Sequence, residues 1–213
     1  MDAMDIYRRL LNHFGKQDWW PVEHGFRPRE FEIIAGAVLT QNTNWSNVRK
    51  ALKRMERAGF LSPRAVAEAG SKQLEEAVRP SGFYRQKAER LKMLSQFIES
   101  FGSFGEFRKS VTREELLSLK GIGPETADSI LLYALGRRVF VIDAYTLRIF
   151  SRLGFRQWDS YEEWRKFFEN EVLEDTGLYM QYHALIVEHA KMFCRKKPLC
   201  SSCPLADACA RKA

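Results

Sequence analysis

The sequence predicts an all-α protein of about ten helices. Apolar residues recur at helical spacing through most of the chain, and glycine and proline interrupt them at short intervals. Val139–Ile142 is the only convincing β-like run. The chain has 213 residues, of which 45% are hydrophobic, so it can bury a core in one or two domains. Apolar runs such as 33–39 are too short to cross a bilayer, which excludes a membrane protein.

Five segments carry the helical periodicity, and turn residues separate them. Three segments are recognised by their apolar faces, which are Phe31, Ile34, Val38 and Leu39; Trp45, Val48, Leu52 and Met55; and Ile130, Leu131, Ala134 and Leu135. The other two are the helical stretches at residues 162–173 and 179–193. The breaks are expected at Gly59, Pro63, residues 80–82, Gly102, residues 121–124, Gly136, Gly154 and Gly177. The sequence contains no repeat, low-complexity tract or long linker.

Residues 116–127 indicate a tight connection between two helices. Gly121 and Gly123 permit a turn without a Cβ, Ile122 is expected to pack inward, and Pro124 suits the first position of the next helix. Two interpretations of this segment are equally supported. It is a compact helix–helix connection, or it presents backbone N–H groups to a phosphate at a helix N-terminus.

Four cysteines, the only ones in the chain, lie in its last twenty residues with the spacing C-x5-C-x2-C-x5-C: Cys194, Cys200, Cys203 and Cys209. Thiolates are soft ligands, so this pattern predicts an iron–sulfur cluster or a structural zinc site. Zinc sites usually pair two C-x2-C knuckles, whereas this chain has one. The amino terminus lacks an apolar signal region, so we expect a reducing cytosol, in which disulfides seldom persist.

The chain is basic, with 34 lysines and arginines against 27 acids and a formal charge of +7. Such an excess is compatible with simple solubility or with a polyanionic partner. The segment around the cysteines favours the polyanion, because its cations outnumber the single acid Asp207. These cations are Arg195, Lys196, Lys197, Arg211 and Lys212.

Together, the hairpin, the Val141-Ile142-Asp143 segment and the four cysteines resemble the helix–hairpin–helix DNA glycosylases of the endonuclease III family. The resemblance covers residues 30–209. It implies a two-lobed helix–hairpin–helix fold in which the cysteines hold a [4Fe-4S] cluster. This chain departs from the family pattern in its first cysteine gap, which has five residues where six are usual, but all four ligands are in place.

The resemblance implies that Asp143 is the catalytic carboxylate. An anion at this point would stabilise an oxocarbenium-like sugar while water attacks. Asp143 is also placed to cap the helix that begins at Ala144, and the two roles are compatible. Bifunctional members carry a lysine where this chain has Glu125, and a carboxylate cannot form a Schiff base. We therefore expect base removal without lysine-dependent AP-lyase activity. Glu125 also suits the first turn of a helix as a favourable charge.

A narrower resemblance is to the 3-methyladenine DNA glycosylases of endonuclease III type. It rests on Trp19-Trp20-Pro21 and on the segment 39–45, which ends at Trp45. Aromatic faces can hold an extruded base and attract a cationic purine, although tryptophans also fill cores. That branch often lacks the cluster, which separates it from this chain. The substrate-pocket residues implied are Glu125, Trp19, Trp20, Trp45, Gln41 and Asn42.

We expect DNA-binding roles for two groups of residues, the first from the family resemblance and the second from open backbone N–H groups and positive charge. Gln41 and Phe83 would fill the space left by a flipped base, Arg85 would reach the orphaned partner base, and Phe83 could instead pack beneath its turn. The hairpin and the basic loop would bind phosphates. The complete set is Lys120, Gly121, Ile122, Gly123, Phe83, Arg85, Lys196 and Lys197. The four histidines show no ligand or triad spacing, so core or surface roles are expected for them.

We therefore expect a cytoplasmic, nucleoid-associated, monomeric DNA glycosylase acting on double-stranded DNA that contains a damaged base. One lobe would span residues 27–138, with six helices, the wedge loop and the hairpin. The other would combine residues 1–26 with 139–213 and carry the cluster. Two alternatives stay open: a glycosylase for deaminated or oxidised pyrimidines, and a non-enzymatic iron–sulfur protein that binds DNA.

Overall fold

Helices are the only regular secondary structure in the computed structural model, which describes residues 2–210. The predicted all-α class is confirmed. The β-like run Val139–Ile142 is buried but has no partner strand. Side chains satisfy its backbone instead: the Phe140 N–H donates to Glu169 Oε1 at 3.1 Å, and the Ile142 N–H donates to the Tyr161 hydroxyl at 3.3 Å. Its β-branched composition thus reflects burial.

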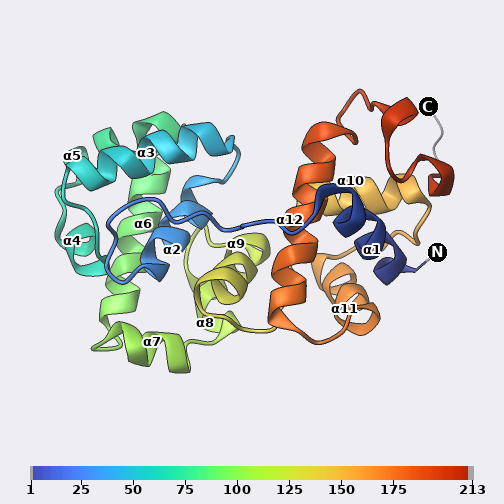
Figure 1. Ribbon diagram of the computed structural model, residues 1–213. Coiled ribbons are helices and arrows are strands. Elements are labelled where there is room, and N and C mark those ends of the chain that lie inside the picture. The colour runs from blue at the N-terminus through green and yellow to red at the C-terminus, as the bar shows by residue number, and fades with distance from the viewer. Residues whose placement is uncertain (1, 211–213) are drawn as a thin grey trace. The chain divides into compact units, whose positions relative to one another are not determined.

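The chain divides into two compact units (Figure 1). The first comprises Met1–Trp19 and Gly136–Ala213, and the second comprises Trp20–Leu135. The lobe boundaries expected from the sequence, at residues 27 and 138, stay a prediction.

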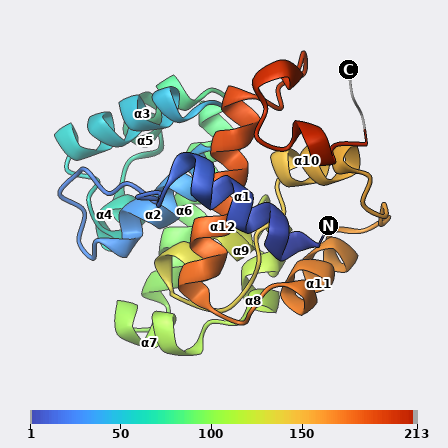
Figure 2. The same cartoon turned by 45° about the vertical axis from the view of Figure 1, so that its right-hand side comes forward.

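The first unit is built around its longest helix, α12, which packs against α1 and α10 (Figure 2). Its helices are α1 (Ala3–Phe14), α10 (Ala144–Leu153), α11 (Tyr161–Glu171) and α12 (Thr176–Met192), followed by the 3-10 turns η3 (Cys200–Ser202) and η4 (Ala206–Ala208). Side-chain caps fix the starts of all four α-helices. Because each cap satisfies N–H groups that the helix leaves open, the helix starts follow from local sequence.

Aromatic side chains form the core of the first unit. The Phe140 and Phe168 rings stack with centroids 4.3 Å apart and an interplanar angle of 9°. Phe150 meets Phe168 edge-on at 4.6 Å, and Tyr182 is fully buried beside them. Aromatic contacts of this kind stabilise a core beyond the area they bury. This core supports the N-terminal end of α10, which carries Asp143.

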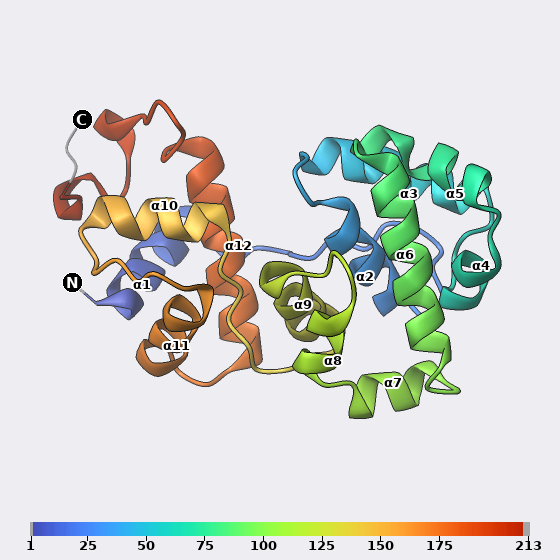
Figure 3. The same ribbon diagram turned by 180° about the vertical axis from the view of Figure 1, so that it is seen from behind.

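The second unit contains the remaining helices, and Figure 3 shows α6 packed against α4 and α5. They are α2 (Glu30–Leu39), α3 (Trp45–Arg57), α4 (Pro63–Glu68), α5 (Ser71–Val78), η1 (Arg79–Ser81), α6 (Tyr84–Glu99), α7 (Phe104–Ser110), α8 (Arg113–Ser118), α9 (Pro124–Ser129) and the π-helical turn η2 (Ile130–Ala134). Within the described residues, no helix is long and apolar enough to span a membrane.

Helix α2 is the central helix of the second unit. All of its residues from Phe31 to Leu39 are buried, as expected for a helix that is apolar on every side. Its one buried acid, Glu32, accepts from the Glu23 and His24 backbone N–H groups at 3.0 Å and lies 2.6 Å from His24 Nδ1. The helix ends directly before the segment 41–44, so its burial fixes where that segment leaves the core.

Candidate functional site

Asp143 is the N-cap of α10, as the sequence predicted. Its Oδ1 accepts from the Thr146 N–H at 2.7 Å and from the Thr146 hydroxyl at 2.8 Å. Its other oxygen, Oδ2, lies 3.6 Å from Nε2 of His183 on α12. The carboxylate is 9% exposed, so these neighbours and the helix N-terminus define its environment.

Burial opposes ionisation of Asp143, but the nearby His183 and the two Thr146 donors outweigh it, and the pKa of Asp143 is lowered. A carboxylate held in its charged form can stabilise positive charge that develops next to it. The arrangement provides a buried anion whose orientation is set before any substrate arrives.

The connection between α8 and α9 forms the predicted tight turn. Gly121 has φ +83°, and a Cβ there would lie 2.2 Å from Arg90 Nε, so glycine is required. Ile122 is 4% exposed and packs inward. Gly123 is exposed, and a Cβ on it would have nothing within 4 Å. Both glycines are exposed, but an added Cβ would point into open space at Gly123 and into the Arg90 side chain at Gly121.

Gln41 is held by residues of the second unit through both ends of its amide. Its Nε2 donates to the Gly121 carbonyl at 3.0 Å and to the Thr126 hydroxyl at 2.9 Å. Its Oε1 accepts from Arg90 Nη1 at 2.5 Å. The amide thus ties the segment after α2 to the α8–α9 turn, and the side chain of Gln41 is held in one orientation.

Lys87 links the same segment to the loop before α6. Its ammonium is buried and donates to the Leu39 carbonyl at 2.9 Å and to the Ser81 carbonyl at 2.6 Å. Burial, with a contribution from Arg90, lowers the pKa of Lys87 to about 8. Asn42 and Phe83, in the two linked loops, both have positive φ, 52° and 46°. This is an unusual conformation for side chains other than glycine.

Phe83 projects from its loop with 65% of its surface exposed. The Arg85 side chain is 79% exposed and lies 3.9 Å from a Glu75 carboxylate oxygen. The alternative that Phe83 packs beneath its turn does not describe this conformation. An exposed phenylalanine on a loop with left-handed backbone is available to contact a partner.

The two adjacent tryptophans have different surroundings. Trp20 meets Trp45 edge-on, with centroids 5.3 Å apart, and lies 5.4 Å from the Tyr133 ring. It packs against Gly36, where a Cβ would lie 3.1 Å from the indole. Trp19 instead lies under the Lys191 ammonium, 5.3 Å from the ring centroid. Within the second unit, the structure therefore brings Trp20 together with Trp45.

Glu125 stands in the first turn of α9, beside the open backbone of Gly123, and its side chain is exposed. Its backbone carbonyl accepts from the Ser129 hydroxyl at 2.7 Å. Lys120, before the turn, is 87% exposed and lies 4.0 Å from Glu89. The hairpin therefore presents one acid and one cation to its surroundings.

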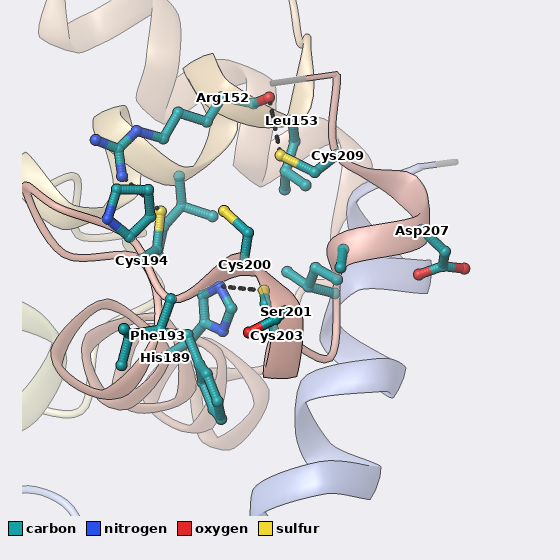
Figure 4. A pocket seen from close by; sticks show the side chains of 15 residues that line it. Arg152, Leu153, His189, Phe193, Cys194, Cys200, Ser201, Cys203, Asp207 and Cys209 are labelled. Carbon is teal, nitrogen blue, oxygen red and sulfur yellow. Dashed lines mark hydrogen bonds between the residues drawn. The ribbon is translucent and has the colours of Figure 1, made fainter. Parts of the chain in front are cut away.

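The four cysteines line a single cavity of about 690 Å³ (Figure 4). None of them forms a disulfide. Within the described residues, no three potential ligands converge on a point that could hold one metal ion. Burial raises the pKa of the Cys203 thiol, and the other three cysteines add to this shift. Four thiolates in this cavity therefore require positive charge between them.

Polar groups on the wall of the cavity contact the cysteines. Arg152 Nη1 lies 3.2 Å from Cys194 Sγ, and the Arg152 carbonyl accepts from Cys209 Sγ at 3.3 Å. His189 Nε2 lies 3.8 Å from Cys203 Sγ, a contact drawn in Figure 4. Donors around thiolate sulfurs are the usual surroundings of a metal–sulfur centre. The residues present fit a group held by four thiolates.

The basic loop after Cys194 is anchored through its backbone. Arg152 donates to the Arg195 carbonyl at 2.7 Å and to the Lys196 carbonyl at 3.3 Å. The side chains of Lys196 and Lys197 are left exposed. Arg211 and Lys212, the other basic residues expected here, lie outside the described residues.

Sequence reasoning missed three residues of these sites: His183, Lys87 and Arg90. His183 carried no motif, and it is buried beside Asp143 because α12 packs on α10. Lys87 follows the wedge loop closely, but nothing in the sequence distinguishes a buried lysine from an exposed one on an amphipathic helix. Arg90 lies one turn further along the same helix.

Comparisons with known proteins match this architecture. The profile of the HhH-GPD superfamily of base excision DNA repair proteins matches residues 35–193. A Methanocaldococcus jannaschii protein, assigned by inference as a DNA repair glycosylase, is 46% identical over 214 residues, covering 97% of this chain and 95% of that protein. Endonuclease III of Thermotoga maritima is 31% identical over 181 residues, covering 84% of this chain and 82% of that protein.

Among solved structures, the H. pylori 3-methyladenine DNA glycosylase bound to 1,N6-ethenoadenine is similar with a TM-score of 0.80. The two sequences are 36% identical, and the match covers 90% of this chain and 98% of that one.

Proposed function

The chain belongs to the HhH-GPD superfamily of base excision DNA repair proteins, and we propose that it is a monofunctional DNA glycosylase for alkylated purines such as 3-methyladenine. One observation carries the proposal: a buried, ionised carboxylate, Asp143, held by Thr146 and facing His183.

Asp143 would act on the sugar of the damaged nucleotide. The bond between C1′ and the base nitrogen breaks, its electron pair leaves with the base, and a water oxygen bonds to C1′ while the proton that the water loses passes to solvent. The sugar carries positive charge in the transition state, which a fixed anion stabilises. A purine alkylated on a ring nitrogen is already cationic and leaves as a neutral molecule, so its departure requires no general acid. Oriented by Thr146, the Asp143 carboxylate needs no rearrangement during the reaction.

Glu125 supports the monofunctional part of the proposal. A Schiff base with C1′ needs an amine, and the side chain beside the hairpin is a carboxylate. The nearest hairpin amine in sequence, Lys120, precedes the turn and extends into solvent. Water would therefore be the nucleophile, and the strand would stay intact after base release.

The lesion class is supported by the second unit. Trp20 and Trp45 present a pair of aromatic rings beside α2, and such rings attract a cationic base more strongly than a neutral one. The exposed carboxylate of Glu125 would favour the same positive charge. The similar H. pylori protein is a 3-methyladenine DNA glycosylase, which agrees with this lesion class.

We propose that Cys194, Cys200, Cys203 and Cys209 hold a [4Fe-4S] cluster. The four cysteines line one cavity of about 690 Å³, and their C-x5-C-x2-C-x5-C spacing has one C-x2-C knuckle where zinc sites usually pair two, which supports a cluster over one zinc ion. When bound, the cluster would supply a structural cross-link and positive charge for the thiolates. Anaerobically prepared protein should contain iron and sulfide near four each per chain. One zinc and no iron would contradict this assignment.

The DNA partner would be a duplex containing the damaged base, bound by a monomer. Phe83 and Gln41 would enter the stack, Arg85 would reach the orphaned base, and the turn at Gly123 would approach a phosphate. The exposure of Phe83 and the open backbone at Gly123 support these roles.

A panel of duplexes tests the proposal. Purified protein is incubated with duplexes carrying 3-methyladenine, uracil, a thymine mismatch or an oxidised pyrimidine, and both free base and strand breaks are measured. We expect release of 3-methyladenine with intact strands. Preferential release of a pyrimidine would change the proposed lesion class but would leave the proposed role of Asp143 unchanged. No release from any duplex would favour the non-enzymatic DNA-binding alternative.

Borohydride trapping tests the monofunctional claim separately. The native protein should form no covalent adduct with lesion-containing DNA, because residue 125 is a glutamate. A robust adduct would show that another amine attacks C1′. Glu125→Gln should reduce release of 3-methyladenine more than release of a neutral lesion, and equal losses would make Glu125 a structural residue.

A further inference from the structure

Helix α3 carries a basic stripe that the proposed active site does not use. Five cations occupy its exposed side: Arg49, Lys50, Lys53, Arg54 and Arg57. Most of them, together with Arg79 of η1 and with Asn47, line a groove of about 490 Å³ between α3 and η1. We call this groove, defined by Asn47, Lys50, Lys53, Arg54, Arg57 and Arg79, the α3 groove.

Acids neutralise only part of the stripe. Glu23 pairs with Arg49 at 2.9 Å, and Glu76 is shared between Arg54 at 3.6 Å and Arg79 at 3.1 Å. The acid of α3 itself, Glu56, accepts from the Gly25 N–H at 3.0 Å.

Among the described residues, three cations of the stripe form no ion pair, although Glu23 and Glu56 line a neighbouring groove with Lys50 and Lys53, and Glu76 lines another with Arg57. Within residues 2–210, no ion pair or side-chain hydrogen bond engages Lys50, Lys53 or Arg57. They recur every three or four residues, so they share one face of α3. Like charges this close repel one another, and a bound polyanion would relieve the repulsion.

The groove continues from the two loops proposed as the wedge. Its α3 wall begins at Asn47, just after the segment 41–44, and its η1 wall ends directly before Gly82 and Phe83. Lys87 ties these two loops together through the Leu39 and Ser81 carbonyls. Both walls of the α3 groove therefore follow directly along the chain from, or lead directly into, the segments that carry Gln41 and Phe83.

We infer that the α3 groove binds the backbone phosphates of duplex DNA flanking the lesion, beyond the base pairs that the wedge would touch. This inference rests on the proposed DNA-glycosylase function. Lys50 to Arg57 covers about 10 Å of helix at 1.5 Å per residue. One DNA strand offers a phosphate about every 3.4 Å along its axis, so the three cations match about three successive phosphates. Continuity with the wedge loops favours DNA over an acidic protein as the occupant.

The test compares a triple variant, Lys50→Ala, Lys53→Ala and Arg57→Ala, with the native full-length protein. Affinity for an undamaged duplex several helical turns long is measured across salt concentrations. We expect the log–log salt slope to fall by two to three units, about 0.9 per lost contact. Between 50 and 200 mM salt, a difference of that size changes the native-to-variant affinity ratio roughly forty-fold. The three side chains are exposed, so circular dichroism and the melting temperature should be unchanged.

A charge-matched variant, Arg27→Ala, Arg29→Ala and Arg64→Ala, is the control. These cations are also exposed on the second unit. Arg27 and Arg29 precede α2 at the end opposite to the segment 41–44. The control should alter the slope much less than the α3 variant. Equal changes in both would mean that only net charge matters and would overturn the inference.

Duplex length separates this inference from the proposed function. On a duplex trimmed to a few base pairs around the lesion, the α3 variant should release base as the native protein does, and its binding deficit should vanish. Failure of the native protein to release any base would defeat the proposed function, yet the salt slopes on undamaged DNA would still be informative. An unchanged slope for the α3 variant on long DNA would assign the groove to another partner, such as an acidic protein.

Discussion

Asp143 in the first unit and the side chains of Phe83, Lys120 and Glu125 in the second unit differ in how firmly the protein holds them. Asp143 is buried, and its oxygens are directed by Thr146 and faced by His183. Phe83, Lys120 and Glu125 are exposed. The orientation of the carboxylate is therefore set by its neighbours, whereas the exposed side chains are open to solvent.

Hydrogen bonds from Lys87 and Arg90, however, hold the segments that carry these exposed side chains. Lys87 joins the segment after α2 to the loop before α6, and Arg90 holds Gln41 against Gly121. Asp143 and the loop that carries Phe83 are thus each held by polar contacts of a buried group, Asp143 itself and Lys87, and leaving such a group unpaired is costly. The predictions below separate the two kinds of support.

Replacing Asp143 with asparagine should have the largest effect. Asparagine keeps an acceptor for the Thr146 N–H and is a good N-cap, but it has no charge. Base release should fall by about 10²–10³-fold or more, the range typical of losing an electrostatic stabiliser of the transition state. Single-turnover kinetics measure this loss, with Asp159→Asn as an exposed control. Near-native turnover would exclude Asp143 as the catalytic carboxylate.

Replacing Lys87 with methionine should disturb the wedge and the fold together. Methionine fills a similar volume but leaves the Leu39 and Ser81 carbonyls without their donor, which costs about 1–3 kcal/mol for each unsatisfied group. Urea unfolding measures the change in the free energy of unfolding.

Lys87→Arg, which retains donors, should recover part of this loss. Binding to a duplex with an abasic site, where no base has to be extruded, should be affected less than release from an intact pair. If Lys87→Met were as stable and active as the native protein, the link between the two loops would carry no function.

Alanine substitutions at Gly121 and Gly123 should separate an effect on stability from an effect on DNA binding. Gly121→Ala forces a side chain into positive φ, at about 1–2 kcal/mol, and displaces Arg90. Gly123→Ala meets no protein atom and has ordinary φ, so its melting temperature should hardly change. It should weaken DNA binding instead, because the new methyl group obstructs the approach of a phosphate. Equal loss of stability in both variants would contradict the open geometry at Gly123.

Replacing Lys196 and Lys197 with alanine should have a smaller and uniform effect. These exposed lysines would contact phosphates, so damaged and undamaged duplexes should lose affinity alike. The salt slope should fall by about 0.9 per contact. Filter binding at several salt concentrations measures it. If affinity fell only for damaged DNA, Lys196 and Lys197 would recognise the lesion itself.

The smallest effect is expected on acid stability. The pKa of Asp143 is lowered in the folded state relative to about 3.9 when unfolded. Its contribution to stability is therefore complete above that unfolded value and is lost as pH falls through the folded pKa. Asp143→Asn should flatten the dependence of unfolding free energy on pH in this acid range only. A difference in slope at neutral pH would point to another titrating group.

The sequence by itself determined the features that depend on near neighbours. The helical class, the cap that Asp143 provides for α10, the turn at Gly121 and the gathering of four cysteines in one loop all follow from residues a few positions apart. Such interactions form wherever the local pattern occurs, because the chain between the partners is too short to separate them.

Only the tertiary structure decided the partners that come from distant parts of the chain. The packing of α12 on α10 places His183 beside Asp143. In the second unit Trp20 packs against Trp45, and in the first unit Trp19 lies under the Lys191 ammonium. Burial of Lys87 likewise depends on the meeting of α2, η1 and α6. No local spacing encodes these contacts, because each depends on how whole helices pack and on which side chains that packing removes from water.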